Sequence, residues 1–269
     1  MSIPKKIHYC WFGGAELPEL AIRCMASWEK YCPDYEIIRW DESNSDLESC
    51  QFVREAYAEK KWAFVSDYMR LKVVEEHGGI YLDIDVELLK PLDPFLEYQG
   101  FMGVEQAKPY CVNTGLGFGA VAHHPVIRKL MVNYENTPFI KADGSFDMMP
   151  CPQRDTVVLK SLGLKQDGRF QDVAGIVVYP PDIFSPISLL GDKLFTENTI
   201  SIHHFNASWV TSDQKKYIKC KANLVRQFGH DVGGLIALVI AFLFLIKQKG
   251  FLYSCRKVIC KVIPFLKLK

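Results

Sequence analysis

Residues 78–90 read GGIYLDIDVELLK, from Gly78 to Lys90, and two aspartates interrupt this otherwise hydrophobic stretch. The apolar run predicts a buried strand, and carboxylates are costly to bury unless they are paired or bind a cation. Because strand side chains alternate, Asp83 and Asp85 are expected on one face at the strand's end. Such paired carboxylates suit Mg²⁺ or Mn²⁺, which in turn can hold a diphosphate. The alternative is a solvated strand end, because the D-x-D spacing is common.

The segment just upstream, FVSDYMRLKVVEEHGG at 64–79, predicts a helix. Ser66 or Asp67 is expected to cap its start, and Gly78 suits a left-handed stop. Asp67 and Arg70 lie three residues apart and share a helix face. The helix would bring this pair near the two aspartates. Asp67 could then accept a hydrogen bond from a sugar hydroxyl, and Arg70 could bind hydroxyl or phosphate oxygens. A surface salt bridge is the alternative.

Strands and helices alternate through the first 90 residues, which predicts an α/β sandwich with parallel strands. Beyond residue 91 the pattern is less regular, and it contains four short strands and one helix. The earlier expected elements are strands at 6–12 and 35–40 and helices at 17–31 and 50–60. The later ones are strands within 100–106, 114–121, 174–186 and 199–210 and a helix at 124–134.

The charge of the chain is unevenly distributed. The formal net charge is +1, but the first 231 residues hold 25 basic and 31 acidic side chains, and no acidic residue follows Asp231. An acidic body excludes the basic groove that a nucleic-acid binder needs. The nine cysteines form no C-x-x-C pair, which indicates reduced thiols and a cytosolic body. The N-terminus has no apolar run long enough for a signal peptide, so it is expected to be retained.

The C-terminal part differs in character from the rest. Residues 232–246 are 15 apolar residues without a charge, fewer than the roughly 18–20 expected of a spanning helix. Residues 247–269 interleave seven basic residues with apolar ones, which suits the surface of an anionic leaflet. We therefore expect a catalytic domain at 1–229 and a membrane-associating tail at 230–269, a monotopic or re-entrant anchor on the cytoplasmic face. A buried C-terminal helix is the alternative.

Four motifs in order resemble glycosyltransferase family 32, the D-x-D sugar transferases. They are IPKKIHYCWFGG at 3–14, AFVSDYMRL at 63–71, GGIYLDIDVELLKPLD at 78–93 and HHFNASW at 203–209. The resemblance covers residues 3–210 and is densest at 63–92. It implies a GT-A fold, which is a Rossmann-like nucleotide-sugar-binding sandwich, with dependence on a divalent metal and sugar transfer with retention of configuration. The glucosyltransferase domain of the large clostridial toxins carries a similar set of motifs.

The resemblance also implies roles for particular residues. Trp11 matches a tryptophan that stacks on the nucleobase, with a core tryptophan as the alternative. Tyr81 matches a tyrosine near the donor phosphates, with a packing role as the alternative. The other matches are the sugar-gripping pair Asp67 and Arg70, the ribose and hydrated-metal contact Asp83, the direct metal ligand Asp85, and the diphosphate-closing pair Ser208 and Trp209.

Two further sets of candidates are less defined. His204 or His203 is expected to be an additional metal ligand, and strand alternation predicts that only one of the two reaches the metal. Asn113 of VNTGLG and Asp155 of PQRDT are candidates for donor-sugar or acceptor contacts, with polar surface loops as the alternative.

These observations predict a metal-dependent retaining hexosyltransferase. The expected donor is a UDP-hexose, although family 32 also uses GDP-mannose, and the expected acceptor is a glycan or lipid-linked oligosaccharide in surface polysaccharide synthesis. Two alternatives remain. A phosphoaspartate phosphatase also uses a strand-end D-x-D, but its motif opens the domain and here Glu87 occupies the fifth position. The other is a non-catalytic membrane-tethered protein that binds sugar or lipid.

Overall fold

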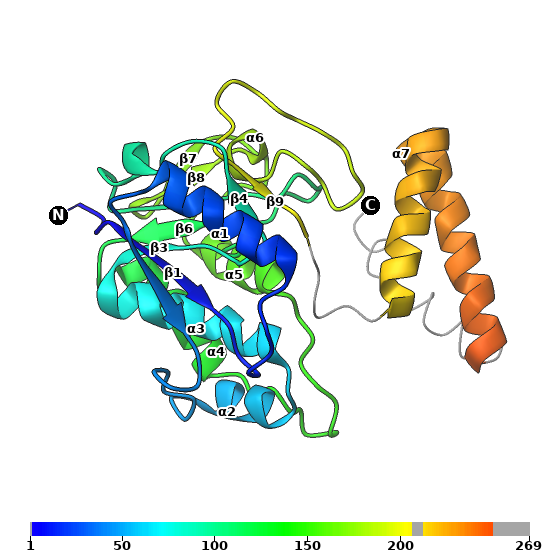
Figure 1. Ribbon diagram of the computed structural model, residues 1–269. Coiled ribbons are helices and arrows are strands. Elements are labelled where there is room, and N and C mark those ends of the chain that lie inside the picture. The colour runs from blue at the N-terminus through cyan, green and yellow to red at the C-terminus, as the bar shows by residue number, and fades with distance from the viewer. Residues whose placement is uncertain (1, 206–211, 250–269) are drawn as a thin grey trace. The chain divides into compact units, whose positions relative to one another are not determined.

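Residues 2–205 and 212–249 are described by the computed structural model of the chain (Figure 1). The described residues form two compact units, one of residues 2–188 and 192–205 and the other of residues 189–191 and 212–249. The domain limit predicted at residue 229 remains a prediction. The predicted pair Ser208 and Trp209 lies outside the described residues.

The first unit alternates strands and helices along the chain. Its strands are β1 (Lys6–Cys10), β2 (Glu36–Trp40), β3 (Gly79–Tyr81), β4 (Val86–Leu88), β5 (Gly100–Gly103), β6 (Phe118–Ala120), β7 (Gln171–Val173), β8 (Ile176–Tyr179) and β9 (Ser201–His203). Its helices are α1 (Glu19–Tyr31), α2 (Gln51–Ala58), α3 (Trp62–His77), the 3₁₀ helix η1 (Asp93–Phe95), α4 (Pro125–Glu135), α5 (Cys151–Ser161) and α6 (Pro181–Phe184).

Seven strands form the main sheet, in the order β2-β1-β3-β6-β5-β8-β7. β1 runs parallel to β2 and β3, and β5 runs parallel to β8. β6 is antiparallel to β3 and β5, and β7 is antiparallel to β8. The α/β class and the parallel pairing of the early strands are thus confirmed, while the sheet as a whole is mixed.

Side chains of the sheet alternate between two hydrophobic clusters, one on each face. On one face Cys10, Tyr81 and Phe118 pack with buried residues of α2, α3, α4 and α5. On the other face Ile7 and Ile80 pack with Trp28 of α1 and with other buried residues. Figure 1 shows α1 and α3 on opposite sides of the sheet. The helix predicted at 17–31 is thus present, and its Cys24 and Trp28 side chains are fully buried.

The single strand predicted across residues 78–90 is wrong. β3 ends at Tyr81, and β4 pairs instead with β9 in a separate two-stranded antiparallel sheet. The cause is a tight turn, in which the Val86 amide donates to the Asp83 carbonyl at 3.0 Å. Asp83 and Asp85 therefore lie in a crossover between two sheets and not on one strand face.

The predicted cap at Ser66 or Asp67 is also wrong, because α3 begins one turn earlier at Trp62. The Phe64 and Val65 amides already donate to the Lys61 carbonyl. The predicted stop is confirmed, since Gly78 has a φ of 62° and follows the last helical residue. Asp67 consequently lies in the middle of α3, where its side chain faces the interior.

The second unit consists mainly of α7 (Ser212–Lys249), a helical segment interrupted at Gly229, where φ is 78° and ψ is 168°. Among the described residues no helix combines the length and apolar character needed to cross a membrane. Several large apolar side chains of α7 are nevertheless exposed, namely Phe228, Val232, Leu235, Leu238, Val239, Ile240 and Leu243.

His8 of β1 joins three elements through its imidazole. The side chain is fully buried, its Nδ1 accepts from Trp40 Nε1 at 3.1 Å, and its Nε2 donates to the Gly78 carbonyl at 2.8 Å. This pairing requires a neutral ring, because a protonated Nδ1 cannot accept. Burial lowers the pKa of His8 to about 4.

We expect His8 to make the fold sensitive to mild acid. Between pH 6.5 and 4 the unfolded chain binds a proton that the folded His8 excludes, so the contribution of His8 to stability falls as pH drops. From pH 7 to 5 this contribution falls by roughly 2 kcal/mol. Urea unfolding at both pH values measures it: the stability at pH 5 relative to pH 7 should rise by about this amount in His8→Gln, while the exposed His123→Asn keeps the pH dependence of the wild type. An unchanged pH dependence in His8→Gln would contradict this role.

Candidate active site

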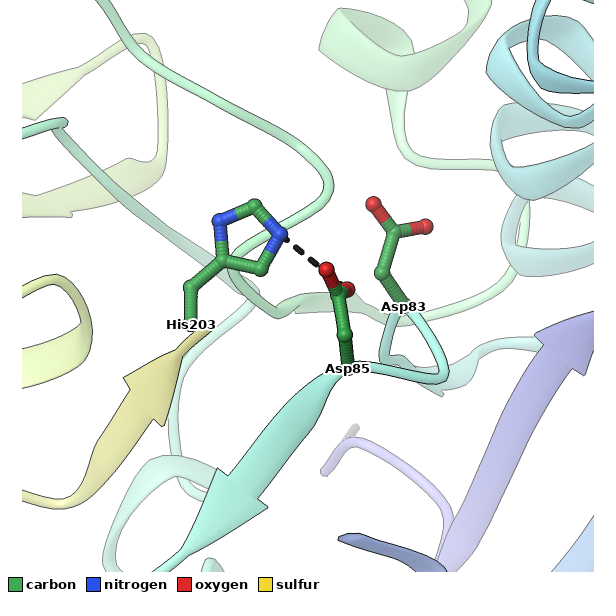
Figure 2. Close-up of side chains that lie close together, drawn as sticks. All are labelled: Asp83, Asp85 and His203. Carbon is green, nitrogen blue, oxygen red and sulfur yellow. Dashed lines mark ion pairs between the residues drawn. The ribbon is translucent and has the colours of Figure 1, made fainter. Parts of the chain in front are cut away.

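Asp83, Asp85 and His203 gather at the point where the two sheets meet (Figure 2). One ligand atom from each lies within 4.8 Å of the others. The pairing of Val86 with His203 across β4 and β9 places the imidazole beside Asp85, with Nε2 3.2 Å from Oδ1. Two carboxylates and one imidazole form a donor set that fits Mn²⁺ or Mg²⁺.

The two adjacent histidines have different partners. His203 faces Asp85, whereas His204 Nε2 lies 2.8 Å from Glu87 Oε2. The predicted alternation therefore holds, and the structure brings His203, not His204, to the aspartates. Burial by itself lowers the pKa of His203, but the negative charges of Asp85, Asp83 and Glu105 outweigh it and raise the pKa. A cation bound there would displace the proton that these charges attract.

We expect the two histidines to differ in their effect on metal binding. His203→Ala should weaken Mn²⁺ affinity by at least about tenfold, because it removes a nitrogen ligand from the group. His204→Ala, a matched change one residue away, should leave the affinity nearly unchanged. Titration of each purified variant with Mn²⁺, followed by electron paramagnetic resonance, measures this directly. Equal affinities, or a larger loss in His204→Ala, would show that the assignment is wrong.

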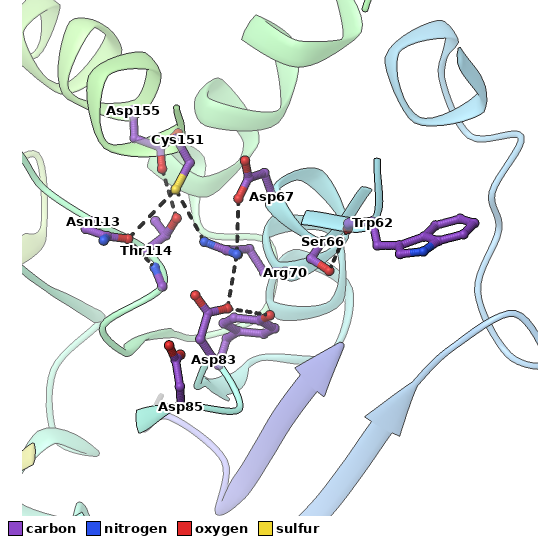
Figure 3. Close-up of polar contacts among 12 residues, drawn as sticks. Trp62, Ser66, Asp67, Arg70, Asp83, Asp85, Asn113, Thr114, Cys151 and Asp155 are labelled. Carbon is purple, nitrogen blue, oxygen red and sulfur yellow. Dashed lines mark hydrogen bonds and ion pairs between the residues drawn. The ribbon is translucent and has the colours of Figure 1, made fainter. Parts of the chain in front are cut away.

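Arg70 of α3 connects the helix to the candidate metal-ligating group, which consists of Asp83, Asp85 and His203 (Figure 3). Its Nη2 lies 3.1 Å from Asp67 Oδ1 and 3.0 Å from Asp83 Oδ1. Tyr81 Oη donates to the same Asp83 oxygen at 2.9 Å. The sequence-predicted pair Asp67 and Arg70 is thus buried beside Asp83 and does not form a surface salt bridge. Burial raises the pKa of Asp67 to about 6, although the Arg70 charge opposes the rise.

Asn113 and Asp155 both lie close to this group, and each has partners of its own. Asn113 Nδ2 donates to Glu105 Oε1 at 2.8 Å, and its Oδ1 accepts from the Gly115 amide at 2.6 Å. Asp155 Oδ2 accepts from Thr114 Oγ1 at 2.9 Å. Neither residue lies on a polar surface loop, since Asn113 is 5% and Asp155 1% exposed.

Three residues of the site escaped the sequence reasoning. Cys151 Sγ accepts from Arg70 Nη1 at 3.4 Å, Glu105 holds Asn113, and Gly115 approaches Asp83. A Cβ at Gly115 would lie 2.3 Å from Asp83 Oδ2, so a side chain cannot be added there without displacing the carboxylate. Glu105 did carry a signal, as an acid within the strand predicted at 100–106, while nothing in the sequence marks Cys151.

Trp11 lies apart from these contacts. It directly follows β1, its indole Nε1 donates to the Ala15 carbonyl at 2.6 Å, and its half-buried ring packs on the cluster that contains Trp28. Its proposed stacking on a nucleobase remains a prediction.

Comparison with known proteins identifies the region that contains Asp67, Arg70, Asp83 and Asp85 of this site. Residues 18–102 match the family model described as "Glycosyltransferase sugar-binding region containing DXD motif". The inositol phosphoceramide mannosyltransferase 3 of Schizosaccharomyces pombe is 28% identical over 142 residues, which are 51% of this chain and 39% of the relative. Human alpha-1,4-N-acetylglucosaminyltransferase is 36% identical over 80 residues, 29% of this chain and 22% of the relative.

Each of these alignments spans less than half of the relative's own length. Among solved structures, the PaToxG glycosyltransferase aligns with a TM-score of 0.47 and 21% identity, over 60% of this chain and 70% of that one.

The class defined by the matched region is that of the DXD glycosyltransferases, and the comparisons support transferase activity. The resemblance to glycosyltransferase family 32 is confirmed, because residues 18–102 match the model of the sugar-binding region that carries the DXD motif. The phosphoaspartate phosphatase and the non-catalytic binding protein are accordingly not favoured.

Proposed function

We propose that this chain is a metal-dependent retaining glycosyltransferase of GT-A-like fold. It moves a hexose from a nucleoside-diphosphate sugar to a glycan or lipid-linked oligosaccharide. The observation that carries the proposal is the continuous set of contacts from Asp67 through Arg70 and Asp83 to Asp85 and His203. In support, residues that can hold a cation lie beside a buried guanidinium, and these are two kinds of group that bind a diphosphate.

The chain's own residues divide the work of sugar transfer in this proposal. Asp83, Asp85 and His203 hold Mn²⁺ or Mg²⁺, which supplies Lewis-acid stabilisation of the departing diphosphate. Arg70 adds a fixed positive charge to that leaving group, and its buried Nε has no hydrogen-bond partner among the described residues. Asp67 accepts from a sugar hydroxyl. Tyr81 lies near the phosphates, Trp11 stacks on the base, and Ser208 and Trp209 close over the diphosphate.

The carboxylates also favour the developing charge on the sugar. The breaking glycosidic bond gives the ring oxocarbenium character, which nearby negative charge stabilises. Asp67, Asp83 and Asp85 supply such charge from one side. The departing phosphate takes the proton of the acceptor hydroxyl, so no covalent nucleophile is assigned.

A donor-hydrolysis assay tests the proposal. The full chain is incubated with UDP-glucose, UDP-galactose, UDP-N-acetylglucosamine or GDP-mannose, each with Mn²⁺, Mg²⁺ or EDTA. The last two donors follow from the mannose and N-acetylglucosamine in the relatives' names. We expect hydrolysis of one donor that EDTA abolishes. Folded protein that neither binds nor hydrolyses any donor would overturn the proposal.

We further propose that α7 and the segment after it hold the enzyme on the cytoplasmic face of a membrane, where a lipid-linked acceptor resides. In support, the exposed side chains of Val232, Leu235, Val239 and Leu243 recur at helical spacing, and residues 247–269 add seven basic and no acidic side chains. The curated mannosyltransferase relative is named for a lipid substrate, inositol phosphoceramide.

Vesicle sedimentation tests this attachment. The full chain should sediment with phosphatidylserine-containing vesicles more than with neutral phosphatidylcholine vesicles, and less at high salt. Leu235→Glu with Val239→Glu should abolish binding, while Ile22→Glu, which alters an exposed apolar residue of the first unit, should not. Binding that is unaffected by the α7 changes would contradict the proposal.

A further inference from the structure

The first half of α5 holds the chain segment that lies against Asp83. Thr156 Oγ1 accepts from the Val112 amide at 2.9 Å, and Asp155 Oδ2 accepts from Thr114 Oγ1 at 2.9 Å. Thr114, Asp155 and Thr156 are all 3% exposed or less. Two successive residues of one helix therefore fix two positions of the neighbouring segment, and water does not compete for these bonds.

The held segment continues directly into a contact with Asp83. The Gly115 carbonyl accepts from the Asp83 amide at 3.3 Å, and the Gly115 amide donates to Asn113 Oδ1. The Gly115 Cα is so close that an added Cβ would lie 2.3 Å from Asp83 Oδ2 and 3.2 Å from Arg70 Nη1. The position of Gly115 therefore decides where the Asp83 carboxylate can lie.

We infer that Asp155 is a positioning residue of the proposed transferase site, which sets the Asp83 carboxylate through Thr114 and Gly115. The inference rests on the proposed function and assigns Asp155 an indirect role, with no contact to donor or acceptor. Figure 3 shows Asp155 above Thr114, while Asp83 and Asp85 lie below Arg70.

The environment of Asp155 suits a neutral group. Its Oδ1 is buried and has no hydrogen-bond partner among the described residues. Burial raises the pKa of Asp155 to about 7, and the charge of Asp67 adds to the rise. An asparagine has the same shape without the charge and can still accept from the Thr114 hydroxyl. A positioning role therefore tolerates Asp155→Asn, whereas a role that needs the carboxylate itself does not.

The test compares four single variants and one double variant of the full chain. Asp155→Ala and Thr114→Val each remove one buried hydrogen bond and should weaken Mn²⁺ affinity, measured by paramagnetic resonance, by about tenfold. Asp155→Asn and Thr114→Ser keep the bond and should stay within about threefold of the wild type. The double variant Asp155→Ala with Thr114→Val should bind Mn²⁺ no more weakly than the single variant with the lower affinity, because both changes break the same hydrogen bond.

Donor hydrolysis and melting temperature are measured on the same samples. A merely structural contact would lower the melting temperature of Asp155→Ala without changing its Mn²⁺ affinity, which would overturn the inference. So would an Asp155→Asn variant as impaired as Asp155→Ala, since Asp155 would then act through its charge. If the wild type itself neither binds Mn²⁺ nor hydrolyses a donor, the proposed function fails first and the inference fails with it.

Discussion

Asp85→Asn should abolish most of the metal-dependent activity while leaving the chain folded. Asp85 lies 3.2 Å from His203 Nε2 and is the central member of the metal-ligating group. Loss of an outer partner of a metal site typically costs ten- to a hundredfold in affinity or activity, and loss of a direct ligand should cost at least as much. We expect Mn²⁺-dependent donor hydrolysis to fall by about a hundredfold or more, with a melting temperature close to that of the wild type.

The matched control is Glu87→Gln, two residues further along β4. Glu87 is a carboxylate that contacts a histidine, His204, but it lies outside the metal-ligating group. Its substitution should leave hydrolysis within about threefold of the wild type, because the contact is partly exposed and weak. Comparable losses in both variants would mean that general electrostatics, and not metal ligation, explains the result.

Arg70→Met should destabilise the fold in addition to impairing catalysis. The Arg70 side chain is 5% exposed and neutralises two carboxylates, those of Asp67 and Asp83. Removing one partner of a buried ion pair typically costs about 3–5 kcal/mol, because the remaining charge is left uncompensated. The melting temperature should fall by about 6–20 °C, which differential scanning calorimetry measures.

The pH dependence of this loss identifies its cause. Burial already raises the pKa values of Asp67 and Asp83, and removal of the guanidinium raises them further. The folded variant therefore binds protons that the unfolded chain releases, so its defect grows as pH rises and is smaller at pH 5 than at pH 8. Adding Asp67→Asn should restore part of the lost stability at pH 8. A defect that is the same at both pH values would point to lost packing instead of uncompensated charge.

The local elements of the fold could be predicted because each has its own pattern. Alternation of strand and helix predicted the α/β class, and Gly78 predicted the end of α3. The reading of residues 78–90 as one strand failed because Asp83 and Val86 close a tight turn, and the apolar residues on both sides look the same whether they lie in one sheet or two. The periodicity of apolar residues predicts which side chains are buried, but it does not predict against which strand or helix they pack.

The parts of the site that could be predicted are those whose residues lie close together in the sequence. Asp67 is close in sequence to Arg70, and Asp83 is close to Asp85. Their side chains are carboxylates and a guanidinium, and these groups indicate which ligands the residues can bind. The contacts of Cys151 with Arg70, and of Gly115 with Asp83, join segments far apart along the chain. The choice between His203 and His204 likewise depends on the register of β9 against β4, which the sequence leaves open.

The small sheet of β4 and β9 pairs two segments that lie far apart in the sequence. It therefore closes a long loop that runs from Leu88 to Ser201. Three residue pairs join the two strands, and one backbone hydrogen bond flanks them at each end, from Leu89 to Ile200 and from His204 to Asp85; this short ladder brings His203 beside Asp85. Closing a loop of this length is entropically unfavourable, and so short a ladder is expected to open well below the cost of global unfolding. A cation held by Asp83, Asp85 and His203 would stabilise the closed state by a free energy that grows with the logarithm of its free concentration over its dissociation constant. Hydrogen exchange of the β9 amides should therefore slow when Mn²⁺ binds, so that the sheet of β4 and β9 would stay closed longer at a higher concentration of the ion.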